Sequence, residues 1–173
     1  MPELNNRKFS HLKIHSQYSI CEGAIKIENL KDFCKENKIA SIGISDTSNL
    51  CGALEFAENI SKVGTQPIIG TQIYFKFEDT IGLLPLIALN EKGYKRIIDL
   101  SSRSYLENDA ISDPHLDIKE LLYNTEGVVL FSGTIHGLFG KLFQKGRFEE
   151  ITKLYKDLSK NFNDRFYLEI QRH

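Results

Sequence analysis

Short apolar stretches alternate with amphipathic stretches along most of the chain. Apolar residues that alternate with polar ones, or that run on without a break, predict strands; apolar residues at a spacing of three and four predict helices. The predicted strands are 11–16, 40–46, 66–77, 83–90, 127–133 and 165–172. The predicted helices are 26–38, 49–64, 91–107, 117–124, 136–146 and 147–162. The polar stretch 108–115 is predicted to be a loop.

The recurring order of strand and helix predicts an α/β fold. Such an order favours a parallel sheet with right-handed crossovers, built either as an open sheet or as a barrel. The stretch 127–133, "GVVLFSG", is almost entirely apolar, which is typical of a strand buried on both faces. The last predicted strand has no helix after it, so we expect an incomplete barrel within a larger protein. We expect one domain over 9–173, preceded by a flexible segment over 1–8.

Composition and charge narrow the possible functions. The chain of 173 residues has 22 Lys and Arg against 23 Asp and Glu, for a net charge of −1. A domain that grips nucleic acid is usually basic, so we expect weak direct contact with DNA at most. The apolar runs are too short to span a bilayer, so no membrane contact is expected. The three cysteines form no C-x-x-C pair, which favours a reducing, cytoplasmic setting over a zinc knuckle or disulfide framework.

The first predicted strand carries His11, Lys13 and His15 at alternate positions. Residues two apart in a strand point to the same face, and two histidines on one face suggest a metal site, although the lysine between them argues against it. Of the polar residues near the strand ends, only His15, Asp46 and Glu22 are ordinary metal ligands, which is few for a divalent cation. The pattern leaves two interpretations open, a metal site and a solvated or salt-bridged polar pocket.

Six segments of the chain, in the same order, resemble the N-terminal polymerase-and-histidinol-phosphatase (PHP) domain of bacterial DNA polymerase III alpha subunits. They read "FSHLKIHSQYSICEGAIKIENL", "IGISDTSNLCGALEF", "QPIIGTQIY", "LIALNEKGYKRIIDLSSRSYL", "EGVVLFSG" and "RFYLEIQRH". The resemblance covers residues 9–173. It implies a distorted (βα)7 barrel, PHP-type and TIM-like, of which this chain supplies only the first part. It also implies a place in a DNA-directed DNA polymerase that replicates DNA, with the polymerase active site in later domains.

Family members with an active PHP site hold a metal cluster, and the resemblance maps the ligand positions onto this chain. These positions are Lys13, His15, Glu22, Asp46, Thr47, Gln72, Leu83 and Thr134. His15 and Asp46 match the family pattern, Glu22 is a conservative change, and the other five do not match. We therefore expect a relic site with no catalytic residue and no metal, the alternative being a residual divalent cation near His15 and Asp46. Lys13 is predicted to occupy the space of the lost cation and to pair with Asp46 or Glu22.

Three hypotheses for function follow. In the first, the chain is a metal-free, catalytically silent scaffold of the polymerase. Its partners would then be the rest of the alpha chain and, as in some lineages of the family, the proofreading exonuclease (epsilon) subunit, with DNA reached only through the full polymerase. In the second, it is an active metal-dependent phosphoesterase or 3′–5′ exonuclease. The third, an unrelated metabolic α/β-barrel enzyme, would need a phosphate-binding glycine loop and a complete barrel, and the sequence displays neither.

Overall fold

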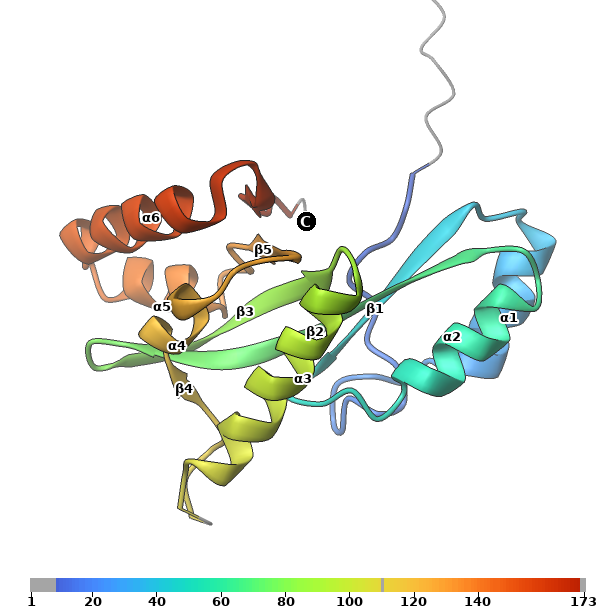
Figure 1. Cartoon of the computed structure of the whole chain (residues 1–173), viewed down its shortest axis with the longest axis horizontal. Coiled ribbons are helices and arrows are strands. Elements are labelled where there is room, and N and C mark those ends of the chain that lie inside the picture. Colours follow the sequence, from blue (N-terminus) through green and yellow to red (C-terminus); the bar gives the residue numbers. More distant parts are fainter. Residues whose placement is uncertain (1–8, 110, 172–173) are drawn as a thin grey trace, which may run out of the picture.

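The computed structural model describes residues 9–109 and 111–171 and centres on a mixed six-stranded sheet (Figure 1). The strands are β1 (Ser41–Thr47), β2 (Gln66–Phe77), β3 (Thr80–Ala88), β4 (Leu116–Asp117), β5 (Val128–Phe131) and β6 (Phe166–Tyr167). The helices are α1 (Ile27–Glu36), α2 (Ala53–Ser61), α3 (Glu91–Leu106), α4 (Ile118–Tyr123), α5 (Leu138–Gln144) and α6 (Phe148–Phe162), with a 3-10 turn at Asn163–Arg165. The segment 1–8, predicted to be flexible, lies outside the described residues, as do position 172, the last of the predicted closing strand, and position 173.

The sheet is mixed rather than parallel. Its strand order is β1-β2-β3-β5-β6, with β4 beside β2. The pairs β1–β2 and β5–β6 are parallel, whereas β2–β3 and β3–β5 are antiparallel. The α/β class is confirmed, and the open sheet agrees with an incomplete barrel. The prediction of parallel order throughout is wrong, because only Glu78 and Asp79 separate β2 from β3, and two residues make a hairpin, not a crossover.

The two ends of the sheet are less regular than the sequence predicts. The predicted strand 11–16 forms only two isolated bridges, from Ile14 to Ile44 and from Ser16 to Ile25. It nevertheless follows the outer edge of β1, since the Ile14 carbonyl accepts a hydrogen bond from the Ser45 N–H at 2.8 Å. At the other end, the predicted strand 165–172 contains regular pairing only over the two residues of β6.

Two apolar clusters form the core. The smaller joins β1 to α1 and α2, with Ile42 and Phe56 fully buried, and Cys34 belongs to it, as predicted. The larger lies between β2, β3 and β5 on one side and α3, α4, α5 and α6 on the other. Figure 1 shows α1 and α2 at one end of the sheet and α4, α5 and α6 at the other. No helix in the described part of the chain is long and apolar enough to cross a membrane.

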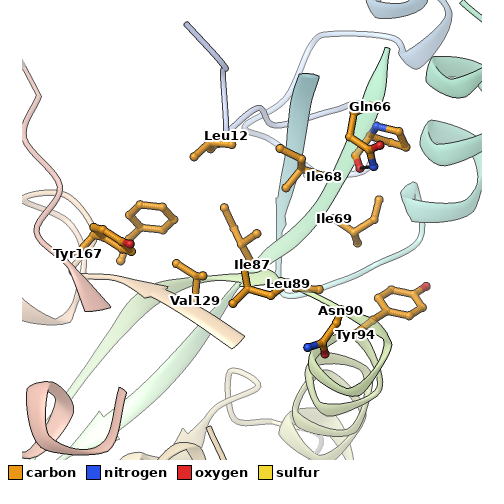
Figure 2. Close-up of a pocket in the computed structure, with 13 residues that line it drawn as sticks. Leu12, Gln66, Ile68, Ile69, Ile87, Leu89, Asn90, Tyr94, Val129 and Tyr167 are labelled. Carbon is orange, nitrogen blue, oxygen red and sulfur yellow. Dashed lines mark hydrogen bonds between the residues drawn. The ribbon is translucent and has the colours of Figure 1, made fainter. Parts of the chain in front are cut away.

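The inner face of the sheet, which carries Ile68, Ile87 and Val129, is hollowed into an apolar groove (Figure 2). The groove has a volume of about 670 Å³. Because side chains alternate between the two faces of a strand, the face that carries Ile68 on β2 also carries Gln72. One face of the sheet therefore holds both the apolar groove and part of the predicted polar site.

Candidate functional site

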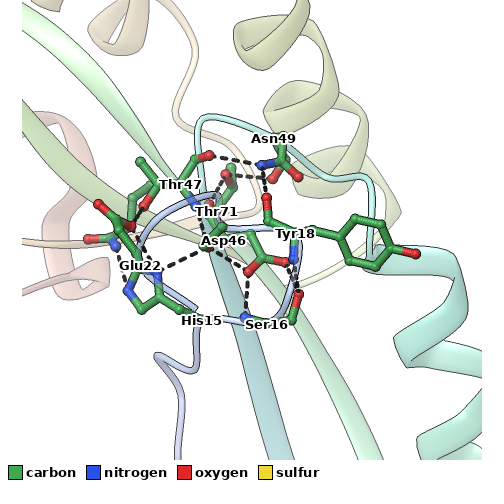
Figure 3. A network of polar contacts seen from close by, with 10 residues as sticks. His15, Ser16, Tyr18, Glu22, Asp46, Thr47, Asn49 and Thr71 are labelled. Atoms are coloured by element: carbon green, nitrogen blue, oxygen red, sulfur yellow. Dashed lines mark hydrogen bonds and ion pairs between the residues drawn. The ribbon is translucent and has the colours of Figure 1, made fainter. Parts of the chain in front are cut away.

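A buried carboxylate, that of Asp46, holds the loop that follows the N-terminal segment. Asp46 lies near the end of β1 and is 2% exposed. Its Oδ1 accepts hydrogen bonds from the Ser16 N–H at 2.6 Å and from Ser19 Oγ at 2.7 Å, and its Oδ2 accepts one from Ser16 Oγ at 2.7 Å (Figure 3). Hydrogen bonds to an ionised acceptor are stronger than neutral ones, so three uncharged donors stabilise this carboxylate without a cation.

The loop itself is folded tightly. The Gly23 N–H donates to the Ser19 carbonyl at 2.8 Å, and a Cβ added to Gly23 would lie 1.9 Å from the Ser16 carbonyl oxygen. Asn49 links the loop to the end of β1, because its Nδ2 donates to the carbonyls of Tyr18 at 3.0 Å and Thr47 at 2.9 Å. The residues between His15 and Gly23 are thereby fixed against the end of β1.

His15 lies on the inner face, and both of its ring nitrogens have polar neighbours. Gln72 Nε2 lies 2.9 Å from His15 Nε2, within hydrogen-bonding distance. The other ring nitrogen, Nδ1, lies 3.2 Å from Ser19 Oγ and 3.3 Å from Glu22 Oε2. The Gln72 amide therefore lies where a metal ion bound to His15 Nε2 would have to approach.

Glu22 and Thr47 complete this cluster. Thr47 Oγ1 donates to Glu22 Oε2 at 2.5 Å, and the Thr47 N–H donates to Ser19 Oγ at 3.1 Å. On the same face, two positions beyond Gln72, the pKa of Tyr74 is raised above its ordinary value of 10.0, first by burial and then by the carboxylates of Glu22 and Asp113. The Glu22 carboxylate is thus contacted by the Thr47 hydroxyl and by His15 Nδ1.

Lys13 does not pair with Asp46 or Glu22, so that prediction is wrong. Its Nζ lies 2.9 Å and 3.2 Å from the two carboxylate oxygens of Glu169, just beyond β6. The pleat explains the error: Ile14 pairs with Ile44, which puts Lys13 on the opposite face of the ladder from Asp46. The ammonium does have a carboxylate partner, but one that lies 156 positions further along the chain.

The remaining two predicted positions lie apart from this cluster. Leu83 is on the same face of the sheet, opposite Tyr74 rather than Gln72. Thr134 is in the loop after β5, where its Oγ1 accepts a hydrogen bond from the His136 N–H at 3.2 Å. The structure therefore brings together His15, Glu22, Thr47 and Gln72, with Asp46 joined to them through Ser19.

Sequence reasoning missed the roles of Ser19 and Glu169. Ser19 Oγ donates to Asp46 and lies within hydrogen-bonding distance of His15 and Thr47, so it links the two halves of the cluster. A serine three residues after Ser16 is a signal for a tight turn and could have suggested this role. Glu169 carries no local signal, because its partner is at the other end of the chain.

The donor set does not fit a metal cluster. Among the described residues, no group of three or more His, Cys, Asp or Glu side chains is placed to hold a metal ion. Divalent sites in proteins need several such ligands converging on one point. Here the oxygens of Asp46 face serine donors, His15 faces an amide, and Lys13 supplies a positive charge of its own.

Comparisons with known proteins agree with the resemblance seen in the sequence. Residues 11–173 match the family model of the PHP domain. The chain is 33% identical to the DNA polymerase III subunit alpha of Caulobacter vibrioides, over 100% of this chain and 16% of that protein. It is 36% identical to the same subunit of Borreliella burgdorferi, over 96% of this chain and 15% of that protein. The chain therefore spans about a sixth of the length of these relatives.

Solved structures give a weaker likeness. An amidohydrolase of Chromobacterium violaceum superimposes with a TM-score of 0.42 and 13% identity, over 85% of this chain and 54% of that one. Likeness at this level says nothing about activity. The family assignment rests instead on the match of the PHP domain model, which extends over residues 11–173 and includes the polar cluster around His15. This chain belongs to the PHP domain family.

Proposed function

We propose that this chain is the N-terminal PHP domain of a DNA polymerase III alpha subunit and serves DNA replication as a metal-free, catalytically silent scaffold. The observation that carries the proposal is the ion pair between Lys13 and Glu169 beside the His15–Gln72 hydrogen bond. These contacts occupy the inner face with a fixed cation and an uncharged amide. A metal ion bound to His15 Nε2 would have to displace the Gln72 amide.

The energetic cost of metal entry supports this assignment. A second positive charge near Lys13 would be repelled, and freeing Asp46 would leave the donors of Ser16 and Ser19 unpaired in a buried site. A metal-assisted hydrolase needs its ions held by most of a ligand set with an open position for water. The eight predicted positions offer only His15, Glu22 and Asp46.

Two partners complete the proposal. The rest of the alpha chain is the first, because the matched relatives are about six times longer than this chain. The proofreading exonuclease is the second, docked on the scaffold as in related polymerases with metal-free PHP domains. The net charge of −1 supports contact with DNA through the full polymerase rather than through this domain.

Catalytic silence is tested with the purified protein, assayed on a nitrophenyl phosphate ester and on a 3′-labelled single-stranded DNA, each with added Zn²⁺, Mn²⁺ or Mg²⁺. We expect no turnover above that of the metal ions alone, and no change in the His15→Ala variant. The alternative, an active phosphoesterase or 3′–5′ exonuclease, predicts metal-dependent turnover that His15→Ala and Asp46→Asn both abolish. Turnover that survives both substitutions would indicate a contaminating enzyme. The protein would then be purified further and the assay repeated.

A further inference from the structure

The ion pair between Lys13 and Glu169 joins two parts of the chain that lie at opposite edges of the sheet. Lys13 belongs to the N-terminal segment that follows the outer edge of β1. Glu169 follows β6, which is the strand at the other end of the order β1-β2-β3-β5-β6. The side chains are 22% and 16% exposed, so the pair is largely shielded from water. It joins side chains from the two edge segments at 2.9 Å.

Both ends of the pair are attached to the sheet by backbone hydrogen bonds. Next to Lys13, the Ile14 carbonyl accepts from the Ser45 N–H at 2.8 Å. At the other end, the Glu169 N–H donates to Ser132 Oγ at 2.9 Å, and the Ser132 N–H donates to the Tyr167 carbonyl at 3.0 Å. The segment that carries Lys13 is therefore hydrogen-bonded to β1, and the segment that carries Glu169 is hydrogen-bonded to the residue that follows β5.

We propose that Lys13 and Glu169 form a clasp that holds the two edges of the open sheet together and couples the order of the N-terminal segment to that of β6. The inference rests on the proposed function in one respect, that no metal ion bridges these strands. β6 has only two paired residues, so few ladder bonds hold it in place. In this role Lys13 and Glu169 are positioning residues.

Partial burial gives the clasp its strength. An exposed ion pair contributes little, because water and salt screen it. Removing one partner of a shielded pair leaves the other charge without a partner in a site where water is limited, which costs much more. Lys92 and Glu126 supply the comparison within the same chain: their atoms approach to 2.8 Å, but the side chains are 72% and 63% exposed.

The test is amide hydrogen exchange on the folded protein, comparing wild type with Lys13→Met, Glu169→Gln and the charge swap that combines Lys13→Glu with Glu169→Lys. We expect Lys13→Met to speed exchange roughly tenfold at the amides of Ser132 and Glu169, a change carried across more than 100 positions of sequence. Glu169→Gln is expected to speed exchange at Ser45 by a similar factor. The charge swap is expected to restore both sites.

Controls decide between a clasp and a general loss of stability. Lys92→Met, which breaks the exposed pair, should leave exchange at Ser132 and Ser45 unchanged. Lys13→Arg keeps the charge and should show wild-type exchange. If Lys13→Met does not fold, Glu169→Gln and Lys13→Arg still test the clasp through exchange at Ser45. Unchanged exchange at Ser132 in Lys13→Met, or an equal rise throughout α3 and α6, would overturn the clasp. Metal content measured on the same samples tests the proposed function separately.

Discussion

Replacing Asp46 with alanine is expected to lower the free energy of unfolding by about 3–4 kcal/mol. The carboxylate accepts hydrogen bonds from Ser16 N–H, Ser16 Oγ and Ser19 Oγ, and it is almost completely buried. Its removal leaves these donors without an acceptor in a site that water reaches poorly, which is the costly case for buried polar groups. Urea unfolding followed by circular dichroism measures the change.

Two further variants show whether the loss at Asp46 comes from the hydrogen bonds. Asp46→Asn keeps the shape but replaces one acceptor oxygen by a donor, so it should lose part of the stability. Asp32→Ala, on the exposed side of α1, should change stability by no more than about 0.5 kcal/mol. A loss below about 1 kcal/mol in Asp46→Ala would contradict the role given to this carboxylate.

Replacing Gly23 with alanine is expected to lower the free energy of unfolding by about 3 kcal/mol. The added Cβ would lie 1.9 Å from the Ser16 carbonyl oxygen and 2.7 Å from its carbon, and both belong to backbone that Asp46 holds in place. Backbone cannot move aside as a flexible side chain can, so the loop between His15 and Gly23 must open.

The matched control for Gly23 is Cys21→Ala, an exposed residue in the same loop, which should leave stability within about 0.5 kcal/mol of wild type. Both variants are measured by the same urea titration. If Gly23→Ala were as stable as wild type, the loop would not be fixed against β1, and the hydrogen bonds of His15 would not be held as described.

The sequence predicts the helices and the central strands well, but it predicts the two end strands and the direction of pairing poorly. Hydrophobic periodicity locates the helices and the strand 41–47, because burial of one face imposes a local pattern. The direction of pairing between β2 and β3 depends on the two residues between them, and the prediction overlooked this hairpin by starting the second strand at 83 instead of Thr80. The regular order of strand and helix then suggested crossovers that the chain does not make.

The candidate site was also predicted only in part. Motif positions alone place His15, Glu22, Thr47 and Gln72 near one another, and the structure brings them into hydrogen-bonding distance. The partner of Lys13 depends on the register of an irregular segment against β1 and on the position of β6, and neither leaves a local trace in the sequence. Glu169 could therefore be found only in three dimensions.

The measurement that tests the central claim most directly is the metal content of the purified protein. The protein is produced with zinc and manganese in the medium and dialysed against metal-free buffer without chelator. Its metal content is then measured by inductively coupled plasma mass spectrometry. The account predicts far less than one zinc or manganese ion per chain, and an unchanged unfolding temperature when either metal is added back. One or more tightly bound ions per chain, with a rise in unfolding temperature that His15→Ala removes, would contradict it.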